Sequence, residues 1–292
     1  MAVSSSSDKL SGLIAVSKQP DIRLFYTLSS PISPTKPIIV TSNSLAAATP
    51  LWDDFAAAFA PTHTIIRYDA RFHGQSPLST SPGFDYQKGH TIEDLAEDVV
   101  KLLDALGVQI PVTYVGLSIG AGVGVILGAK YPERFERLVI VGTKAQAAPG
   151  DDQAFDARIE FLRIEGPRSQ AQQSVQRWFG ESWIASNPDK AKFVEEIVSK
   201  QSFEGFIASV AALRRLNLWS YADDIKKRGD GGRLLFVVGE WDTAVVEDTK
   251  ALAERAGSEV VVVEGAGHIV NVQQPERFHD LVWTYIGRQS RI

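Results

Sequence analysis

A serine lies at the centre of residues 116–120, which read Gly-Leu-Ser-Ile-Gly. An apolar run at 112–115 precedes this segment, and a stretch rich in glycine and alanine follows it at about 119–130. This context predicts a tight turn from a strand into a helix, with Ser118 on the turn and the free N–H groups of the helix start beside it. The pattern indicates a nucleophile for a carbonyl carbon, and a glycine-rich junction with an incidental serine is the alternative.

A serine hydroxyl becomes a strong nucleophile only when a neighbouring base takes its proton. His268 follows an apolar run at 260–263 in a glycine-rich loop, and Asp242 follows the run at 234–238. Because parallel strands end at the same edge of a sheet, we expect Ser118, Asp242 and His268 to meet there as nucleophile, acid and base. Three alternatives stay open, namely Glu240 as the acid, Asp242 as a helix cap only, and a solvated His268.

A tetrahedral intermediate needs hydrogen-bond donors at its oxygen. The backbone N–H of Ile119, directly after the serine, is one predicted donor. The N–H of Leu45, in the loop after the strand expected at 37–40, is the other. Asn43 and Ser44 in the same loop are candidates to contact the substrate, although the Asn43 side chain has the alternative of only bracing the loop.

These residues need a sheet whose strands end at one edge. Apolar strand-type runs alternate with helical patterns along most of the chain, which predicts an α/β fold with a mostly parallel central sheet and helices on both faces. The expected strands lie at 37–40, 64–68, 112–115, 138–141, 234–238 and 260–263, and the expected helices at 51–60, 91–106, 119–130, 247–256 and 275–286.

The alternation stops at 145–218, which is helical in pattern and has no convincing strand. We interpret this stretch as a helical cap inserted into a core formed by 1–144 and 219–292. Trp178, Phe179 and Trp183 in the cap are candidates to line a substrate pocket, with ordinary packing as the alternative for each.

Composition excludes several other classes of protein. The chain has 292 residues, a formal net charge of -5 and no cysteine, which excludes disulfides and cysteine chemistry. The five histidines show no His-x-x-x-His spacing, so we expect no metal site. No block of lysine and arginine stands out, so we expect a small-molecule substrate and no nucleic-acid partner.

The two ends of the chain were compared with known signals for cellular location. The N-terminus lacks the pattern of a secretory signal and no apolar stretch is long enough to span a bilayer, so we expect a cytoplasmic protein without a membrane partner. The C-terminal Ser-Arg-Ile at 290–292 loosely resembles a peroxisomal address, with a frayed polar tail as the alternative. A homodimer is left open.

Several segments together resemble one family. Asn-Ser-Leu at 43–45, the run at 67–76, the serine segment at 116–120, Arg-Trp-Phe at 177–179 and Gly-Ala-Gly-His at 265–268 occur in the order found in the 3-oxoadipate enol-lactonase branch of the α/β-hydrolase superfamily. The resemblance implies the α/β-hydrolase fold with a helical lid. It also implies a cofactor-independent serine hydrolase of a small ester or lactone.

This chain departs from that branch at three places. Phe72 stands where the family usually has glycine, and Ile119 stands where it usually has methionine. Residues 143–146 read Thr-Lys-Ala-Gln in place of a Thr-Ala-Ala-Lys/Arg run. Lys144 is then the candidate to contact a substrate carboxylate, and a site that recognises no carboxylate is the alternative. Two other functions remain, C–C cleavage, retro-aldol or cyclisation chemistry with His268 as base, and a receptor without catalysis.

Overall fold

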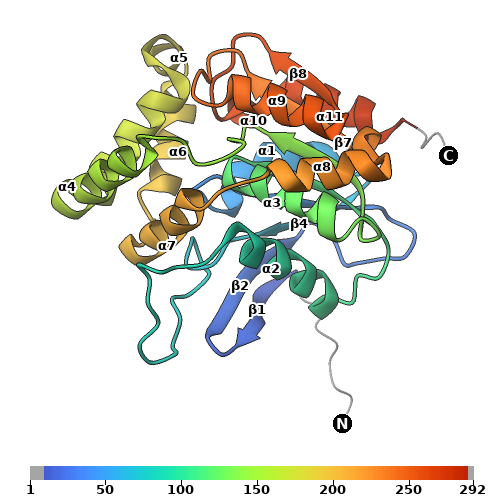
Figure 1. Cartoon of the computed structure of the whole chain (residues 1–292), viewed down its shortest axis with the longest axis horizontal. Coiled ribbons are helices and arrows are strands. Elements are labelled where there is room, and N and C mark those ends of the chain that lie inside the picture. Colours follow the sequence, from blue (N-terminus) through green and yellow to red (C-terminus); the bar gives the residue numbers. More distant parts are fainter. Residues whose placement is uncertain (1–9, 289–292) are drawn as a thin grey trace.

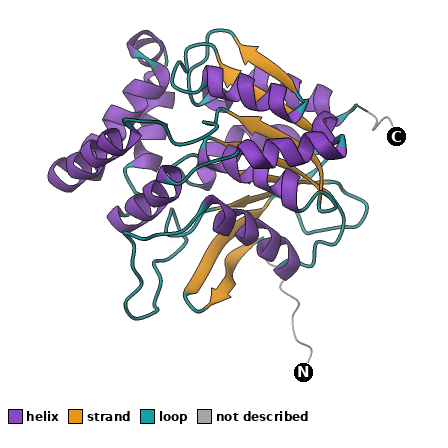
Figure 2. Cartoon of the chain, viewed as in Figure 1, coloured by secondary structure: helices purple, strands orange, loops and turns teal. Residues whose placement is uncertain are grey.

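The computed structural model describes residues 10–288, and its central feature is an eight-stranded sheet in the order β1-β2-β4-β3-β5-β6-β7-β8 (Figures 1 and 2). β2 runs antiparallel to β1 and β4, and every other neighbouring pair is parallel. The strands are β1 (Ser11–Lys18), β2 (Asp21–Leu28), β3 (Ile38–Ser42), β4 (Thr64–Tyr68), β5 (Val112–Leu117), β6 (Phe135–Val141), β7 (Leu234–Gly239) and β8 (Glu259–Val263).

Helices cover both faces of this sheet. In one layer α2, α3, α8 and α9 contact one another in sequence, and in the other layer α1 contacts α11. β3, β5 and β7 are buried at every position, as strands covered on both faces must be. The predicted fold class is therefore confirmed. The core helices are α1 (Asp53–Phe59), α2 (Ile92–Ala105), α3 (Ile119–Lys130), α8 (Trp219–Arg228), α9 (Val246–Ala256), α10 (Val270–Gln273) and α11 (Pro275–Ile286).

Two strands were not predicted. β1 and β2 form an antiparallel hairpin at one edge of the sheet, before the first strand expected from the sequence. β1 is buried on only one face and mixes serine, glycine and lysine with its apolar residues. An amphipathic edge strand of this kind lacks the continuous apolar run that is typical of a strand buried on both faces.

Four helices lie between β6 and α8 in the chain and gather at one end of the sheet (Figure 1). We call them the cap helices: α4 (Asp151–Phe179), α5 (Glu181–Ser186), α6 (Pro188–Val198) and α7 (Phe203–Arg214). The two segments that connect the cap helices to the core lie side by side. The N–H of Ala147 donates to the Leu216 carbonyl, and the N–H of Leu218 donates to the Ala145 carbonyl, each at 2.8 Å. Gly166, with φ +79° and ψ 174°, breaks α4 into two segments.

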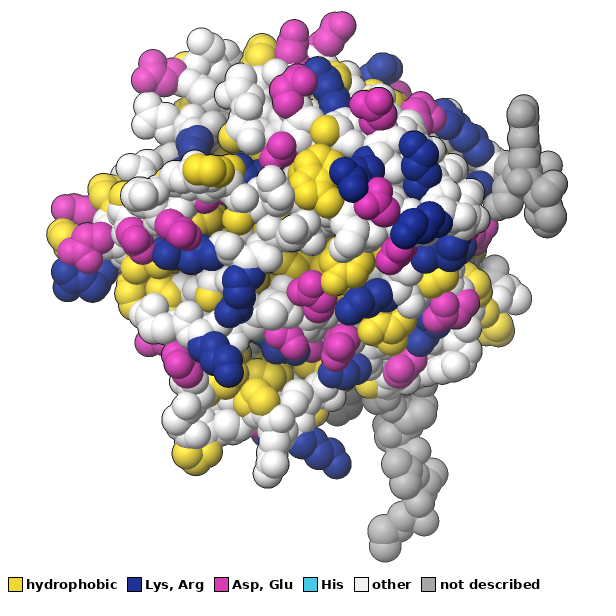
Figure 3. Space-filling view, viewed as in Figure 1, with side chains coloured by type: hydrophobic (Ala, Val, Ile, Leu, Met, Phe, Trp, Pro, Cys, Tyr) yellow, Lys and Arg dark blue, Asp and Glu magenta, His cyan; other side chains and the backbone are white. Residues whose placement is uncertain are grey.

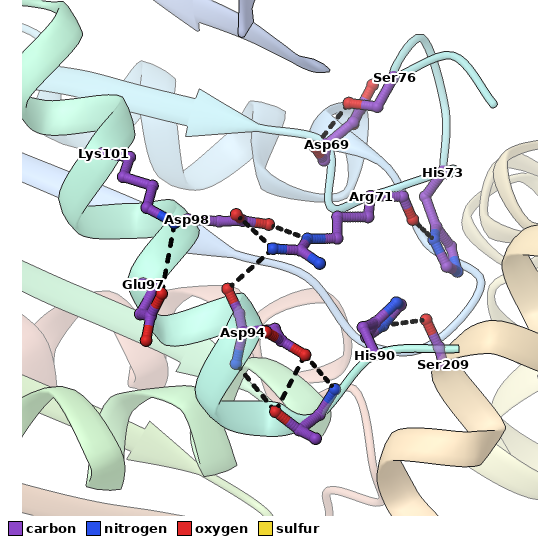
Figure 4. Close-up of polar contacts among 11 residues, drawn as sticks. Asp69, Arg71, His73, Ser76, His90, Asp94, Glu97, Asp98, Lys101 and Ser209 are labelled. Carbon is purple, nitrogen blue, oxygen red and sulfur yellow. Dashed lines mark hydrogen bonds and ion pairs between the residues drawn. The ribbon is translucent and has the colours of Figure 1, made fainter. Parts of the chain in front are cut away.

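A buried polar cluster joins α2, the loop after β4 and cap helix α7 (Figure 4). Arg71 makes a two-point ion pair with Asp98 of α2, and Nη2 of Arg71 lies 2.8 Å from Oδ1 of Asp98. Nδ1 of His73 lies 2.8 Å from the Arg71 carbonyl oxygen, and Nε2 of His90 lies 3.3 Å from Oγ of Ser209 in α7. The cap is therefore attached to the core through groups removed from water.

The surface mixes both charges. On the face shown in Figure 3, acidic and basic side chains are interspersed over the core and the cap helices. Among residues 10–288, no helix has the length and apolar character needed to cross a bilayer. The C-terminal tripeptide at 290–292 lies outside the described residues, so the peroxisomal reading stays a prediction.

Candidate active site

Ser118 stands on a strained turn between β5 and α3. Its backbone has φ +59° and ψ −113°, a region that costs a residue other than glycine about 1–3 kcal/mol. The turn is held by the N–H of Ser118, which donates to the Val141 carbonyl of β6 at 2.8 Å. The serine side chain is thereby presented at the edge where the parallel strands end.

Both glycines of the segment are required by close backbone approach. A Cβ at Gly116 would lie 2.2 Å from the Gly120 carbonyl oxygen. A Cβ at Gly120 would lie 2.7 Å from Oγ of Ser42 in β3. The first neighbour is backbone of α3, and the second is the buried Ser42, whose backbone carbonyl oxygen would also lie 2.9 Å from a Cβ at Gly120. The glycines therefore permit the turn that exposes the serine.

His268 and Asp242 form a close pair. Nδ1 of His268 lies 2.6 Å from Oδ2 of Asp242, and both side chains are largely buried. Asp242 follows β7, and His268 follows β8 in a loop held against β7, since a Cβ at Gly239 would lie 2.1 Å from the Gly267 carbonyl oxygen. The predicted acid and base are thus brought into contact from two different strands.

Ser118 lies with this pair in one cavity of about 220 Å³. In the described part of the chain no hydrogen bond joins Ser118 to His268. Catalytic hydrogen bonds in sites without substrate are often long and shorten in the substrate complex. The cavity is lined by Ser44, Leu45, Ser118, Ile119, Gly142, Thr143, Lys144, Asp151, Phe155, Arg158, Arg177, Trp178, Leu213, Leu216, Trp241, Asp242, Thr243, Ala244, Val245 and His268.

The two predicted oxyanion donors, Leu45 and Ile119, both line this cavity. Leu45 lies in a turn closed by the Ala47 N–H, which donates to the Ser44 carbonyl at 3.1 Å. No acceptor within residues 10–288 takes the backbone N–H of Leu45 or of Ile119. Both donors are therefore free to bind an oxygen atom in the cavity.

Glu240, the rival acid, is engaged elsewhere. Its Oε2 accepts a hydrogen bond of 3.0 Å from the N–H of Gly265, and it does not line the cavity. The remaining histidines are also remote from the serine. His73 and His90 lie in the buried cluster, and His63 and His279 pack edge-on against Phe59.

Three predicted pocket residues lie away from the cavity. The Asn43 amide donates to the Tyr68 carbonyl at 3.0 Å, so this side chain braces the loop. Phe179 is buried and stacks on Trp183, with ring centroids 4.4 Å apart. Trp178, by contrast, lines the cavity and stacks beside the His268 ring. Its carbonyl also accepts the His268 N–H at 3.1 Å, which ties the cap to the histidine loop.

Lys144 lines the cavity as predicted, but its charge is matched. Its Nζ lies 2.5 Å from Oδ1 of Asp151, the first residue of α4. The Lys144 charge and hydrogen bonding together lower the Asp151 pKa, against the opposing effect of partial burial, which is the largest single influence. The Lys144 ammonium, which was predicted to contact a substrate carboxylate, is therefore paired with Asp151.

Two cationic residues of the cavity were not among the predicted site residues. Arg158 and Arg177 both come from α4 and both line the cavity with Ser118. Burial, and then the charge of Arg177, lower the pKa of Arg158 to about 9. Arg177 belongs to the Arg-Trp-Phe segment noted in the sequence, whereas no sequence signal separates Arg158 from the other arginines of α4.

The fold agrees with the comparisons to known proteins. The sequence model of the alpha/beta hydrolase fold matches residues 37–275. The 3-oxoadipate enol-lactonase 2 of Acinetobacter baylyi is 30% identical over 249 residues, which cover 85% of this chain and 87% of that protein. Among solved structures, the enol-lactonase from Burkholderia xenovorans matches with a TM-score of 0.82 and 26% identity, over 95% of this chain and 100% of that one.

A hydrolase from Pseudomonas aeruginosa gives a second structural match, with a TM-score of 0.80 and 28% identity over 95% of this chain and 98% of that one. The resemblance noted in the sequence is thereby confirmed, because a sequence relative and a structural neighbour are both enol-lactonases. The chain belongs to the alpha/beta hydrolase fold family and is a hydrolase of that family.

Proposed function

We propose that the protein is a cofactor-independent serine hydrolase that cleaves a small ester or lactone. The observation that carries this proposal is the contact of 2.6 Å between His268 and Asp242 in the same cavity as the strained Ser118. The names of the enol-lactonase relatives support an ester-like or lactone-like substrate. A cavity of about 220 Å³ favours a small molecule.

In the proposed first step, Oγ of Ser118 attacks the carbonyl carbon while Nε2 of His268 takes the hydroxyl proton. Asp242 accepts the Nδ1 proton of His268 in a hydrogen bond and stabilises the charged ring. The backbone N–H groups of Leu45 and Ile119 donate to the oxyanion that forms.

In the second step, the tetrahedral intermediate expels the alcohol oxygen, which takes the proton from His268 and leaves an acyl group on Ser118. In a lactone this alcohol remains attached to the acyl chain. A water molecule then attacks the acyl carbon while His268 takes its proton, and the acid leaves with Ser118 restored.

The test compares Ser118→Ala with Ser186→Ala, a change at an exposed serine of α5, on a panel of activated esters and lactones. We expect Ser118→Ala to lose turnover by about 10³-fold or more and Ser186→Ala to keep it. An organophosphonate should add covalently to the wild type and to Ser186→Ala but not to Ser118→Ala, as read by intact mass.

Unchanged turnover of Ser118→Ala would overturn the nucleophilic mechanism. If His268→Ala were inactive in the same assay while Ser118→Ala stayed active, His268 would act as a base without a serine nucleophile. That result would favour the alternative chemistry of C–C cleavage, retro-aldol reaction or cyclisation.

A further inference from the structure

The two outer strands of the sheet differ in how well their free edges are protected. β1 is one outer strand, and its pairing with β2 shifts register between Ala15 and Ser17, as at a bulge. It also contains Gly12 and ends in Lys18. Bulges, lysines and glycines weaken the pairing of a free strand edge with another chain. β1 is therefore protected against taking up a further strand.

β8, the outer strand on the other side of the sheet, lacks this protection (Figure 1). It reads Glu-Val-Val-Val-Val, without proline, glycine or lysine, and its pairing with β7 keeps a continuous register. Val260 and Val261 are partly exposed, and Val262 exposes 38% of its surface. An apolar strand edge of this kind can pair with a strand of another chain.

The backbone groups of β8 alternate between facing β7 and facing outward. The N–H of Glu240, which follows β7, donates to the Val263 carbonyl at 3.0 Å, so Val263 faces β7. By alternation Val261 also faces β7, whereas Val260 and Val262 direct their N–H and C=O groups outward. Within residues 10–288, β8 pairs with no strand other than β7. The free edge therefore offers the backbone donors and acceptors of Val260 and Val262.

We propose that two copies of the chain pair through β8, in antiparallel orientation, about a two-fold axis at Val261. In this register Val260 of one copy lies opposite Val262 of the other, and the two residues exchange both of their backbone hydrogen bonds. The two Val261 side chains meet at the centre as a pair without hydrogen bonds. The sheets of both copies then form one continuous sheet. This inference does not depend on the proposed function.

A second copy fits this edge because the edge is complementary to itself. Outside the central valines, Glu259 lies opposite Val263 of the second copy, and Glu264 lies opposite its Ser258. No two like charges are therefore directly opposed, which would destabilise the pairing. Arg288, which pairs with Glu259 at 2.5 Å, adds a positive charge at the end of the strand that Glu264 of the second copy approaches.

Other two-fold registers bury fewer valines against each other. An axis at Val262 would place Val260 opposite Glu264, and an axis at Val260 would place Val262 opposite Ser258. Each of these registers replaces a valine pair with a pair that includes a polar side chain. The axis at Val261 keeps both outward-facing residues in apolar pairs, and so fixes the register.

This pairing closes after two copies. A two-fold interface uses the same edge on both copies, so only the two β1 edges stay free. Pairing of β8 with β1 of the next copy would instead build an open chain of copies. The register shift between Ala15 and Ser17 and the charge of Lys18 oppose that pairing. We therefore expect a dimer and no filament.

Sedimentation equilibrium of the full chain tests the oligomeric state, and we expect twice the mass of the chain at micromolar concentration. Val262→Pro removes an outward N–H from both copies and no hydrogen bond to β7, so it should raise the dimer Kd by about tenfold or more. Val262→Thr keeps the N–H and the branched shape, and as the matched control it should stay dimeric. Far-UV circular dichroism checks that both variants fold.

A cysteine cross-link tests the register, since the chain has no cysteine of its own. Val261→Cys places two thiols opposite each other in a pair without hydrogen bonds, where Cβ atoms come close enough for a disulfide. Mild oxidation with diamide should therefore give a covalent dimer on a denaturing gel. Glu264→Cys, at an exposed residue directly after β8, is the matched control, and its thiols should stay apart.

Three results would overturn the proposal. The first is a wild type that stays monomeric at high micromolar concentration, which would leave the edge to a different protein. The second is a dimer that Val262→Pro does not weaken, because its interface would lie elsewhere. The third is equal cross-linking of Val261→Cys and Glu264→Cys. Species that grow beyond a dimer with concentration would contradict the closed, two-fold pairing.

Discussion

Nδ1 of His268 lies 2.6 Å from Oδ2 of Asp242, although the two residues leave the sheet from different strands, β8 and β7. A carboxylate can only accept hydrogen bonds, so Nδ1 must carry the ring proton in this contact. Nε2 is then left with its lone pair, which is the state that a general base for Ser118 requires. The acid thus selects the tautomer of the histidine.

Replacement of Asp242 by asparagine tests that role. An amide can donate to Nδ1 and would favour the wrong tautomer, so we expect Asp242→Asn to lower kcat by about 10³- to 10⁴-fold with the fold intact. Glu240→Gln is the matched control, because Glu240 only accepts from the Gly265 N–H, and it should keep most of the activity. Larger loss from the Glu240 change than from the Asp242 change, measured as kcat on one ester, would exchange the two assignments.

The elements that carry this site were largely predictable from local sequence. β4, α3 and α11 have the bounds expected from the sequence, because each is an uninterrupted apolar or helical pattern with a turn residue at its end. The hairpin of β1 and β2 was missed because its burial is one-sided. The loops that carry Ser118, Asp242 and His268 could be predicted to converge, since each follows a strand of a mostly parallel sheet and leaves the same edge.

Cap residues could not be placed in this way. Trp178 and Phe179 are neighbours on α4, and successive helical residues point about 100° apart, so only one of them faces the cavity. Whether Trp178 or Phe179 faces the cavity depends on how α4 lies against the core, which the local sequence does not determine. The guanidinium of Arg158 lies against the ring of Phe206 in α7. This contact joins separate helices, so no local sequence pattern predicts it.

Phe72 shows how a departure from the family is accommodated. Its φ is +67°, in the left-handed region that favours glycine, the residue that the resemblance to the family implies at this position. The ring is buried and lies 5.2 Å from the Phe84 ring and 5.1 Å from the Tyr86 ring, measured between centroids. Packing of the aromatic ring offsets backbone strain that the sequence could not reveal.

The buried ion pair of Arg71 and Asp98 should be sensitive to loss of one charge. Asp98→Asn keeps the shape of the side chain but leaves the Arg71 charge unmatched, so we expect the free energy of unfolding to fall by about 3–5 kcal/mol. Asp104→Asn at the exposed pair with Arg134 is the control and should cost about 0–1 kcal/mol. Urea unfolding of both variants measures these two changes. Similar decreases in the free energy of unfolding would show that burial of the ion pair is not the cause of the sensitivity.

Gly205, in the first turn of α7, allows the cap to approach the core closely. A Cβ at this position would lie 2.3 Å from the Phe72 carbonyl oxygen, whereas a Cβ at Gly232 would meet open space. We expect Gly205→Ala to lower stability by about 1–3 kcal/mol through overpacking, and to lower activity because the cap shifts. Gly232→Ala should leave both nearly unchanged. Thermal unfolding and ester turnover of the two variants check this, and equal Tm values would contradict it.

Stability should fall as the pH falls, because of two buried histidines. Burial lowers the pKa of His73, and burial followed by the charge of Arg71 lowers the pKa of His90 well below its usual range. In the unfolded chain both rings titrate near pH 6.5, so below about pH 6.5 the unfolded state binds more protons than the folded state. Their contribution to the free energy of unfolding is therefore complete above that pH and is lost toward the lower, folded-state values.

Replacing one ring isolates this effect from the carboxylates of the same cluster, since burial raises the pKa of Asp98 and acts in the opposite direction. His90→Gln can still hydrogen-bond Ser209 of α7 but cannot take up the proton. Below about pH 6.5, its free energy of unfolding should fall less steeply than that of the wild type, by up to about 1.4 kcal/mol per pH unit. Parallel curves in urea titrations over this range would mean that His90 takes up no proton on unfolding.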